Sequence, residues 1–390
     1  MPLHFFTAGE SHGPALAAIL EGLPAGLPLA VETINQDLAR RQQGYGAGPR
    51  MKIEHDQAQI LSGVMDGLTT GAPLAFLIAN RDHEKWRGQA TPPFTRPRPG
   101  HADLSGAAKY GYTDLRPALE RASARETAAR VAVGAACRLF LAQFGIQVGG
   151  YVCSIGEISA NLAGISLAER IRLARASQVG CPQPEAAQAM HTRIQQVMQE
   201  RDTLGGVIEA VVLGLPPGLG SYTQWDRRLD ARLGAAVLSI QAIKGVEIGP
   251  AFEYSRLTGT QVHDPIRVDG ERLVRPSNHS GGLEGGVTTG QPLLVRAAMK
   301  PIATTLTPQE SVDLASGQPA PTQYERSDFC PVPRAVVVVE AMLAFVLADA
   351  LQEKLGGDSL AEMLPRFQTL RQMRLPDLPM DAAEHTWWPA

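Results

Sequence analysis

Three short stretches of this chain occur twice, in the same order in each half. The phrase "GLPAGL" (22–27) returns as "GLPPGL" (214–219), and "TTGAPL" (69–74) returns as "TTGQPL" (288–293). Two Ala-rich apolar runs, 126–144 and 340–355, form the third pair. Repeats outweigh other fold signals because each copy is a structural unit that packs against its neighbour. We therefore predict two copies of one unit, roughly 1–150 and 200–360, within a single domain of residues 1–375.

The residues around these repeats predict the fold class. Short apolar runs bounded by Gly and Pro are typical of strands, and Ala-rich runs that are apolar on most faces are typical of buried helices. The prediction is α+β, with sheets covering a layer of helices. The most apolar run, 335–351, contains Glu340 and Asp349 and is short for a bilayer span, so it is predicted to be core. Residues 376–390 are Pro-rich without periodicity, which indicates a loosely ordered tail.

Overall charge excludes several classes of partner. The 390 residues carry a formal net charge of −3, which gives no global argument for binding nucleic acid or an anionic membrane. Any basic site must be local. The cysteines are far apart without a C-x-x-C pair, which favours unpaired thiols, and the N-terminus lacks a signal-peptide pattern, so a cytoplasmic protein is expected. These cysteines are Cys137, Cys153, Cys181 and Cys330.

Residues 9–13, "GESHG", allow two interpretations. The stretch satisfies the G-x-S-x-G pattern of a hydrolase nucleophile elbow, which would make Ser11 a nucleophile. It also places His12 between glycines that allow the backbone to approach a ligand closely. Either Ser11 or His12 is the reactive group.

Basic residues gather in several glycine-rich or proline-rich motifs. In "RPRPGHAD", Arg98 stands close to His101, and in "ERASARE", Arg121 and Arg125 flank a predicted helix start capped by Ser123. Free N–H groups at a helix N-terminus favour anions, and guanidiniums strengthen this preference. A solvated helix start with surface arginines would have the same sequence.

Two further segments add candidates of the same kind. The loop "ARRQQGYGAGPRMK" (39–52) offers Arg41 and Arg50, and Arg326 and Asp328 precede the apolar run that begins near residue 335. The nine histidines show no metal-ligand spacing such as H-E-x-x-H, so no metal site is predicted. The residues alone indicate an enzyme for a multiply anionic, phosphorylated small molecule, with histidine as proton donor.

The order of the motifs resembles the chorismate synthase family. The matching stretches include "TAGESHG", "RPRPGHAD", "ERASARETAARVA", "HSGGLEGG", "RAAMKPIAT" and "RSDFCPVPRA", and they span about residues 6 to 360. The resemblance implies a β-α-β sandwich with an internally duplicated core of buried helices between antiparallel sheets, and a homotetramer. It also implies 1,4-anti elimination of phosphate from 5-enolpyruvylshikimate 3-phosphate, giving chorismate. Reduced FMN is required without net redox change, and NADPH enters only indirectly or in flavin reduction.

The resemblance further implies roles for individual residues. His12 would donate a proton near the leaving phosphate, His101 would do so near the flavin's pyrimidine edge, and Asp328 would act as a base at flavin N5. The substrate's phosphate and carboxylates would face Arg41, Arg50, Arg98 and Arg125. The flavin would contact Arg121, Ala122, Ser123, Gln241, Ala242, Gly285, Lys300, Pro301, Ile302, Ala303, Thr304 and Arg326.

One position departs from the family pattern. Ala47 stands where a second loop arginine is common, and we expect Arg50 or Arg40 to compensate. Two other functions are alternatives: a serine hydrolase that uses Ser11, and a flavin-binding module without turnover. A nucleophile elbow requires a preceding strand and a following helix, whereas eight residues precede Gly9 and Gly22 follows soon.

Overall fold

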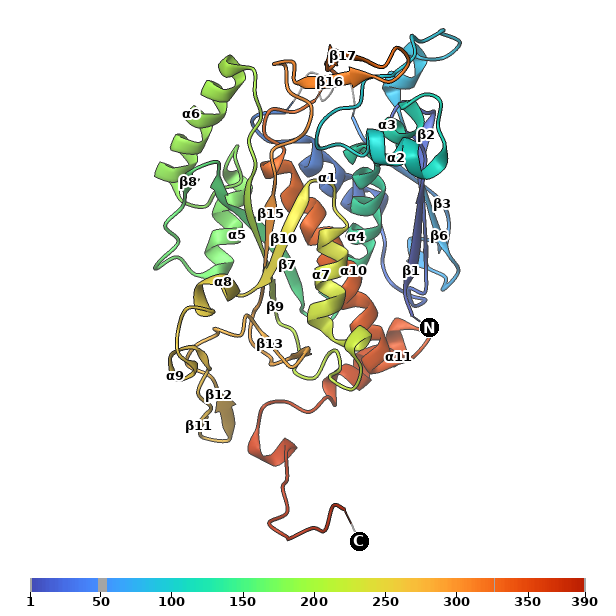
Figure 1. The fold of residues 1–390 in the computed structure, drawn as a ribbon. Coiled ribbons are helices and arrows are strands. Elements are labelled where there is room, and N and C mark those ends of the chain that lie inside the picture. The colour runs from blue at the N-terminus through green and yellow to red at the C-terminus, as the bar shows by residue number, and fades with distance from the viewer. Residues whose placement is uncertain (1, 48–54, 326, 389–390) are drawn as a thin grey trace.

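Two antiparallel sheets enclose a layer of helices (Figure 1). The computed structural model describes residues 2–47, 55–325 and 327–388. Two predicted site residues, Arg50 and Arg326, therefore lie outside the described residues. The α+β class predicted from the sequence is confirmed.

The first sheet is built from N-terminal strands. Its order is β1 (His4–Ala8), β2 (Ala15–Glu21), β6 (Leu74–Ala79) and β3 (Ala58–Ser62), and every pairing is antiparallel. Along β2, Leu16, Ala18 and Leu20 are buried whereas Ile19 is exposed. This alternation places one face of the sheet against the helices and the other outward.

The second sheet repeats the arrangement of the first. Its order is β10 (Ile243–Ile248), β15 (Leu293–Met299), β9 (Gly206–Leu213), β7 (Gln147–Ile155) and β8 (Ile158–Ser159). The phrase "GLPAGL" follows β2 and its counterpart follows β9, and the "TTG" phrases precede β6 and β15. The strand orders β3-β6-β2-β1 and β10-β15-β9-β7 therefore correspond.

The repeated phrases also make matching hydrogen bonds. Thr69 donates its hydroxyl to the carbonyl oxygen of Pro24 at 2.6 Å, and Thr288 donates to that of Pro216 at 2.7 Å. Each threonine hydroxyl also accepts a hydrogen bond from a backbone amide in its own half: that of Leu27 at 2.9 Å for Thr69, and that of Leu219 at 2.8 Å for Thr288. The sequence repeat thus corresponds to a repeated contact between two turns of each half.

Among the described residues, four helices form the layer between the sheets. These are α1 (Val31–Gln42), α4 (Thr127–Ala142), α7 (Leu229–Leu238) and α10 (Val332–Leu355). A Cβ on Gly134 of α4 would lie 2.3 Å from Cβ of Ala341, so only glycine allows α4 and α10 to pack this closely. In α10, 89% of the most apolar stretch is buried inside the protein, which confirms the prediction of a core helix.

Shorter elements surround this core. The peripheral helices are α2 (Asp103–Tyr110), α3 (Arg116–Ala122), α5 (Leu167–Ala176), α6 (Pro184–Glu200), α8 (Ala251–Tyr254), α9 (Gly259–Val262) and α11 (Leu360–Gln368). Short 3-10 turns are η2 (Arg81–Lys85), η3 (Ala124–Glu126), η4 (Trp225–Arg227) and η5 (Leu375–Asp377). Small hairpins pair β4 (Val64–Met65) with β5 (Leu68–Thr69), β11 (Arg267–Asp269) with β12 (Arg272–Val274), β13 (Leu283–Glu284) with β14 (Val287–Thr288), and β16 (Glu310–Asp313) with β17 (Gln318–Pro321).

The C-terminal segment extends away from the body of the protein (Figure 1). After η5, residues 378–388 form no helix or strand and are almost all exposed. The cysteine prediction is confirmed, since all four thiols are unpaired.

Candidate active site

Loops from both halves of the chain enclose a cavity of about 350 Å³ near the N-terminal ends of α4 and α10. A second cavity of about 160 Å³ shares part of its lining. The shared residues are Ser123, Ala124, Gln241, Met299, Ser327, Asp328 and Pro331. The larger cavity is in the usual size range for small-molecule sites.

The loop between β1 and β2 brings His12 to the larger cavity. The loop turns at Gly9, whose φ is +108°, and a Cβ there would lie 2.4 Å from the carbonyl oxygen of Ala15. Ring nitrogen Nδ1 of His12 lies 2.8 Å from Oε1 of Glu120, and the His12 amide donates to Oε2 at 2.7 Å. These contacts fix the ring, so that Nε2 lies on the edge opposite the carboxylate.

The interaction with His12 also affects Glu120. Burial raises the pKa of this carboxyl, but hydrogen bonds and charge from His12 outweigh burial and lower it overall. The His12 ring also contacts the ring of Trp86, with centroids 4.5 Å apart. His12 is therefore held by a carboxylate and an aromatic ring, both distant in sequence.

His101 reaches the same cavity with a similar partner. Its Nδ1 lies 2.6 Å from Oδ1 of Asp103, at the start of α2. Arg98 donates to the same carboxylate through Nε at 2.8 Å and NH2 at 2.9 Å. Burial alone would raise the pKa of Asp103, but hydrogen bonds from Arg98 and His101 hold it well below its usual range. Asp103 is therefore ionised and orients both basic side chains.

Asp328 lies in the segment before α10 and lines both cavities. Arg334, in the first turns of α10, donates through NH1 to Oδ2 of Asp328 and through Nε to the carbonyl oxygen of Arg41 at 2.8 Å. This pairing fixes the position of the Asp328 carboxylate beside the cavity.

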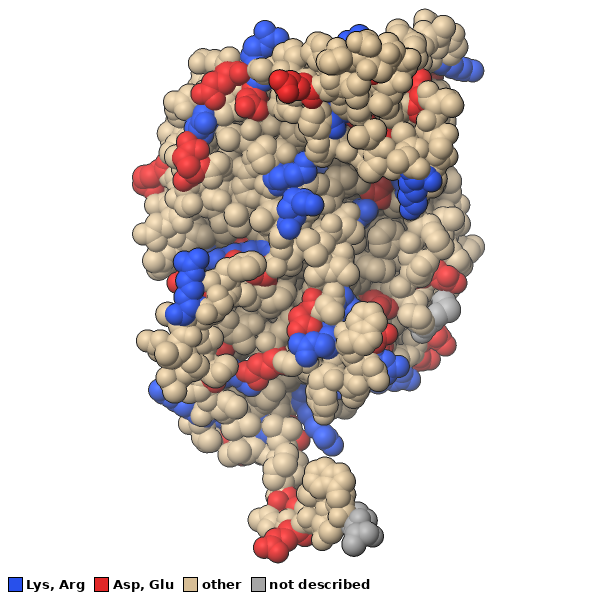
Figure 2. Space-filling model, in the orientation of Figure 1, with Lys and Arg blue, Asp and Glu red and all other residues tan. Residues whose placement is uncertain are grey.

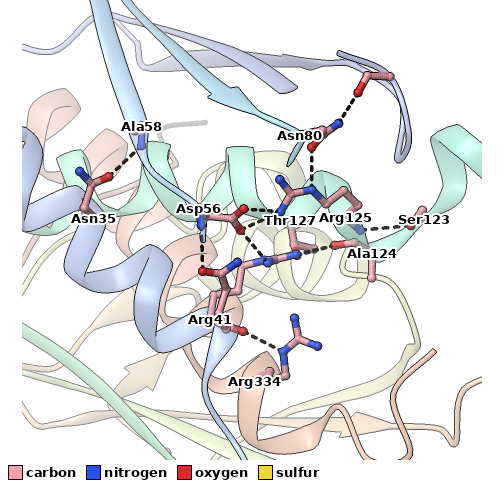
Figure 3. Close-up of polar contacts among 12 residues, drawn as sticks. Asn35, Arg41, Asp56, Ala58, Asn80, Ser123, Ala124, Arg125, Thr127 and Arg334 are labelled. Atoms are coloured by element: carbon pink, nitrogen blue, oxygen red, sulfur yellow. Dashed lines mark hydrogen bonds and ion pairs between the residues drawn. The ribbon is translucent and has the colours of Figure 1, made fainter. Parts of the chain in front are cut away.

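A buried cluster of charges forms the wall of the smaller cavity (Figure 3). Arg125 donates through NH1 to both oxygens of Asp56, at 2.6 and 2.7 Å, and Arg41 donates to Oδ2 at 3.2 Å. Burial lowers the pKa of Arg41 to about 9, Asp56 opposes this change, and the positive charges of Arg334 and Arg125 reinforce it. The predicted substrate arginines Arg41 and Arg125 thus lie side by side.

Other predicted basic residues lie elsewhere. Arg121 is exposed and donates to the carbonyl oxygen of Thr7 at 2.9 Å, and it does not line the cavity. Arg40 forms ion pairs with Glu340 at 2.7 Å and Asp37 at 3.1 Å and lines a separate cavity, which leaves Arg50, outside the described residues, as the expected replacement for the loop arginine. Ser123 caps η3 rather than α4 itself.

Most residues predicted to contact flavin gather at the larger cavity. They are Ala122, Ser123, Gln241, Ala242, Lys300, Ile302, Ala303 and Thr304. Pro301 is beside this lining, and Gly285 lies in the β13–β14 hairpin, away from the cavity. The side-chain oxygen of Gln241 is buried and has no hydrogen-bond partner among the described residues. Burial lowers the pKa of Lys300, which donates to the carbonyl oxygen of Gly100 at 3.0 Å.

The acidic partners of the two histidines were not predicted from the sequence. Glu120 and Asp103 lie inside motifs that were selected for their basic residues, and a histidine in a ligand site needs such a partner to orient it. For Asp103, its position two residues after His101 could have indicated that it is the partner of that histidine. Asp56 had no signal, because its contacts with Arg41 and Arg125 depend on tertiary packing.

The family follows from a comparison with known proteins. The model of the chorismate synthase family matches residues 3–352. The chain belongs to the chorismate synthase family. The chorismate synthase of Chlorobaculum tepidum is 52% identical over 387 residues, covering 95% of this chain and 98% of that relative. That of Aquifex aeolicus is 53% identical over 384 residues, covering 94% and 96%. A crystal structure of chorismate synthase, 47% identical, superposes with a TM-score of 0.78 and covers 94% of this chain and 97% of the other.

These findings confirm the predicted function, chorismate synthase, and its class, a lyase. A serine hydrolase is not favoured. Ser11 is 2% exposed and lies between two paired strands of one sheet, rather than between a strand and a helix as a nucleophile elbow requires. Its hydroxyl accepts a hydrogen bond from that of Ser123 at 3.2 Å. Ser11 is therefore a supporting polar group beside His12.

The surface is of mixed charge outside the site. On the face shown in Figure 2, acidic and basic side chains alternate, and a small basic group lies over the upper ends of β10 and β15. This distribution agrees with the net charge of −3 and with basic groups confined to local sites.

Proposed function

We propose that this chain converts 5-enolpyruvylshikimate 3-phosphate to chorismate by 1,4-anti elimination of phosphate, with reduced FMN and no net redox change. The main support for this proposal is that His12, His101 and Asp328 line one cavity in a chain of the chorismate synthase family. The arginines needed for an anionic substrate lie beside them, in the adjoining cavity or in the same lining.

The arginines bind and orient the substrate. The side chains of Arg41 and Arg125 are only 5% and 3% exposed, and Arg98 is equally buried at 6%. Charges in such surroundings interact more strongly than in water and need little reorganisation as the phosphate leaves with growing negative charge. Guanidiniums that are already in place favour the transition state over the bound ground state.

The two histidines move protons through Nε2. In each ring Nδ1 contacts a carboxylate, which leaves Nε2 for proton transfer, and at His101 the same Nδ1 also lies 3.0 Å from NH2 of Arg98. His12 is assigned to the departing phosphate, and His101 to the flavin edge. Proton transfer by a positioned side chain of this kind contributes about 10²- to 10⁴-fold to a rate.

The residues around the cavity fit a flavin ring. Gln241 Oε1 is a buried acceptor without a partner among the described residues, and the ring edge of a flavin offers an N–H donor. Ala122, Ser123, Ala242 and Lys300 with its neighbours Ile302 to Thr304 would hold the ring, with Pro301 adjacent. When bound, reduced flavin supplies electron density to the substrate. Asp328 would hold a proton at the N5 position.

Several broader properties belong to the same proposal. The two halves are copies of one unit, giving a β-α-β sandwich in a single domain of residues 1–375 with a loosely ordered tail. The protein is a cytoplasmic homotetramer that binds neither nucleic acid nor membrane, and NADPH acts only through flavin reduction. The matching strand orders of the two sheets support the duplication, and the burial of α10 supports a core helix rather than a membrane span.

The decisive experiment measures phosphate release under anaerobic conditions, with the protein, reduced FMN and 5-enolpyruvylshikimate 3-phosphate. Chorismate should form in equal amount, detected by its absorbance. Oxidised FMN is the control and should give no turnover. If the wild-type protein released no phosphate, the proposed enzymatic function would be contradicted. A flavin-binding module without turnover would then be the remaining alternative.

A second experiment tests the assignment of Asp328. Asp328→Ala should bind FMN as wild type does, measured by quenching of flavin fluorescence, but turn over about 10²-fold more slowly. Turnover equal to that of the wild type would remove Asp328 from the mechanism.

A further inference from the structure

Asp56 is the acidic centre of the buried cluster in Figure 3 and lines neither cavity itself. Its side chain is fully buried, at 0% exposure. Both of its oxygens accept from Arg125, and Oδ2 also accepts from Arg41. Asp56 thus lies behind two arginines whose side chains line the smaller cavity.

Each arginine has a second contact that completes its orientation. Nε of Arg41 donates to the hydroxyl of Thr127 at 3.0 Å, and Nε of Arg125 donates to Oδ1 of Asn80 at 2.9 Å. The Asp56 backbone is anchored as well, because its amide donates to Oε1 of Gln42 at 2.9 Å. A planar guanidinium held at two of its edges has one remaining orientation. The cluster is therefore a rigid frame.

Charge explains why an acid is needed at this point. Arg41, Arg125 and Arg334 bring three positive charges to the wall of the smaller cavity, and Asp56 and Asp328 bring two negative charges. Like charges that lie close together repel each other strongly where water is excluded. The positive charges of Arg334 and Arg125 act against the charged form of Arg41, whereas Asp56 favours it. Asp56 therefore offsets the repulsion between these guanidiniums.

We propose that Asp56 is a positioning residue that fixes the guanidiniums of Arg41 and Arg125 for the anionic groups of the substrate. The inference rests on the proposed function, in which these arginines face that substrate. Asp56 affects the binding of anions in two opposite ways. Its negative charge weakens the general attraction of the cavity wall for anions, because it cancels one positive charge. Its hydrogen bonds also hold the two guanidiniums in one geometry, which favours a ligand that matches them. A shaped substrate needs the geometry, whereas a small anion responds mainly to the charge.

The chain offers a matched control at Asp37. Asp37 is 4% exposed, lies on α1, and also joins two arginines, Arg40 at 3.1 Å and Arg138 at 2.6 Å. These arginines line a separate cavity that shares no residue with the proposed active site. Asp37→Asn and Asp56→Asn therefore remove the same charge from similar pairs, and only one pair adjoins the site.

The test compares steady-state turnover and inhibition by inorganic phosphate in the wild type and the two variants. For Asp56→Asn we expect kcat/KM to fall by about 10- to 100-fold, the cost of misplaced substrate-binding groups. We expect inhibition by phosphate to stay as strong or become stronger, since the wall gains net positive charge. Asp37→Asn should keep kcat/KM within about twofold of the wild type and leave phosphate inhibition unchanged.

Three outcomes would overturn the inference: unchanged kcat/KM in Asp56→Asn, an equal loss in Asp37→Asn, or substrate and phosphate both binding better in Asp56→Asn. Absence of turnover in the wild type would contradict the proposed function instead, so the two failures are distinct. If Asp56→Asn does not fold by circular dichroism, Thr127→Val decides. That variant keeps all charges but removes the acceptor of Arg41 Nε, and kcat/KM should fall by about threefold or more. An unchanged kcat/KM in Thr127→Val would refute the inference that the fixed orientation of Arg41 matters for the substrate.

Discussion

His12 and His101 are held in the same way by different parts of the chain. In each, Nδ1 contacts a carboxylate, at 2.8 Å from Glu120 and at 2.6 Å from Asp103. Glu120 is 108 residues from His12, whereas Asp103 is two residues from His101. One contact is a product of tertiary packing and the other of a local loop.

The two carboxylates also differ in their other partners. Asp103 is fully buried and binds Arg98 through both oxygens, so it neutralises an internal charge as well as orienting His101. Glu120 is 12% exposed, and its two carboxylate oxygens contact the ring and the backbone amide of His12. Loss of Asp103 should therefore damage both fold and activity, whereas loss of Glu120 should affect mainly activity.

Replacement of His12 itself should have the largest effect. We expect His12→Ala to lower kcat by about 10³-fold, which is about 4 kcal/mol of transition-state stabilisation. Ser11→Ala is the matched control in the same loop, and it should keep activity within a few-fold. Phosphate release with reduced FMN measures both. A ranking in which Ser11→Ala is the more damaging variant would return Ser11 to the centre of the chemistry.

Asp103→Asn should have the next largest effect, on stability. Leaving the buried Arg98 without its charged partner should lower the free energy of unfolding by about 3 kcal/mol at pH 7, measured by urea denaturation. Because the pKa of Asp103 is lowered in the folded protein, its stabilisation is complete above the unfolded value of about 3.9 and is lost as the pH falls. The difference between wild type and variant should therefore shrink below about pH 4. A difference that grows in acid would contradict the assignment.

Glu120→Gln should show the opposite balance. We expect kcat to fall by about tenfold, equal to about 1.4 kcal/mol, with a smaller change in unfolding free energy than for Asp103→Asn. The amide keeps the size of the side chain but removes the charge at His12 Nδ1. In a His12→Ala background the same change should have little further effect on kcat, because the two residues act as a unit. Additive losses would show that Glu120 acts apart from His12.

Trp86→Phe should give the smallest effect and separates the histidines further. Trp86 contacts the His12 ring, whereas His101 has no aromatic ring contact among the described residues. An aromatic contact of this kind contributes about 0.5–1.5 kcal/mol, so kcat should fall by about threefold. The change should vanish in His12→Ala and persist in His101→Ala. Equal sensitivity in the two backgrounds would place Trp86 outside the support of His12.

Much of the site was predictable because its residues lie in recognisable motifs. The structure brings His12, His101, Asp328 and Arg98 to one cavity, as the resemblance implied. Arg40 lies next to Arg41 in sequence but on another side of α1, where it pairs with Glu340 and lines a separate cavity. Neighbours in a helix point in directions about 100° apart, so adjacency in sequence does not mean a shared site.

The sequence by itself determined the mixed α+β class and the buried core helix, and it predicted that His12 and His101 face a ligand. These follow from turn residues, apolar runs and motifs, which act over a few residues. Only the tertiary structure decided which carboxylate meets which cation, such as Glu120 with His12 and Asp56 with Arg41 and Arg125. The physical reason is the short range of these interactions. A hydrogen bond or ion pair requires atoms within about 3 Å, and packing of the sheets and helices sets that distance between residues far apart in the chain.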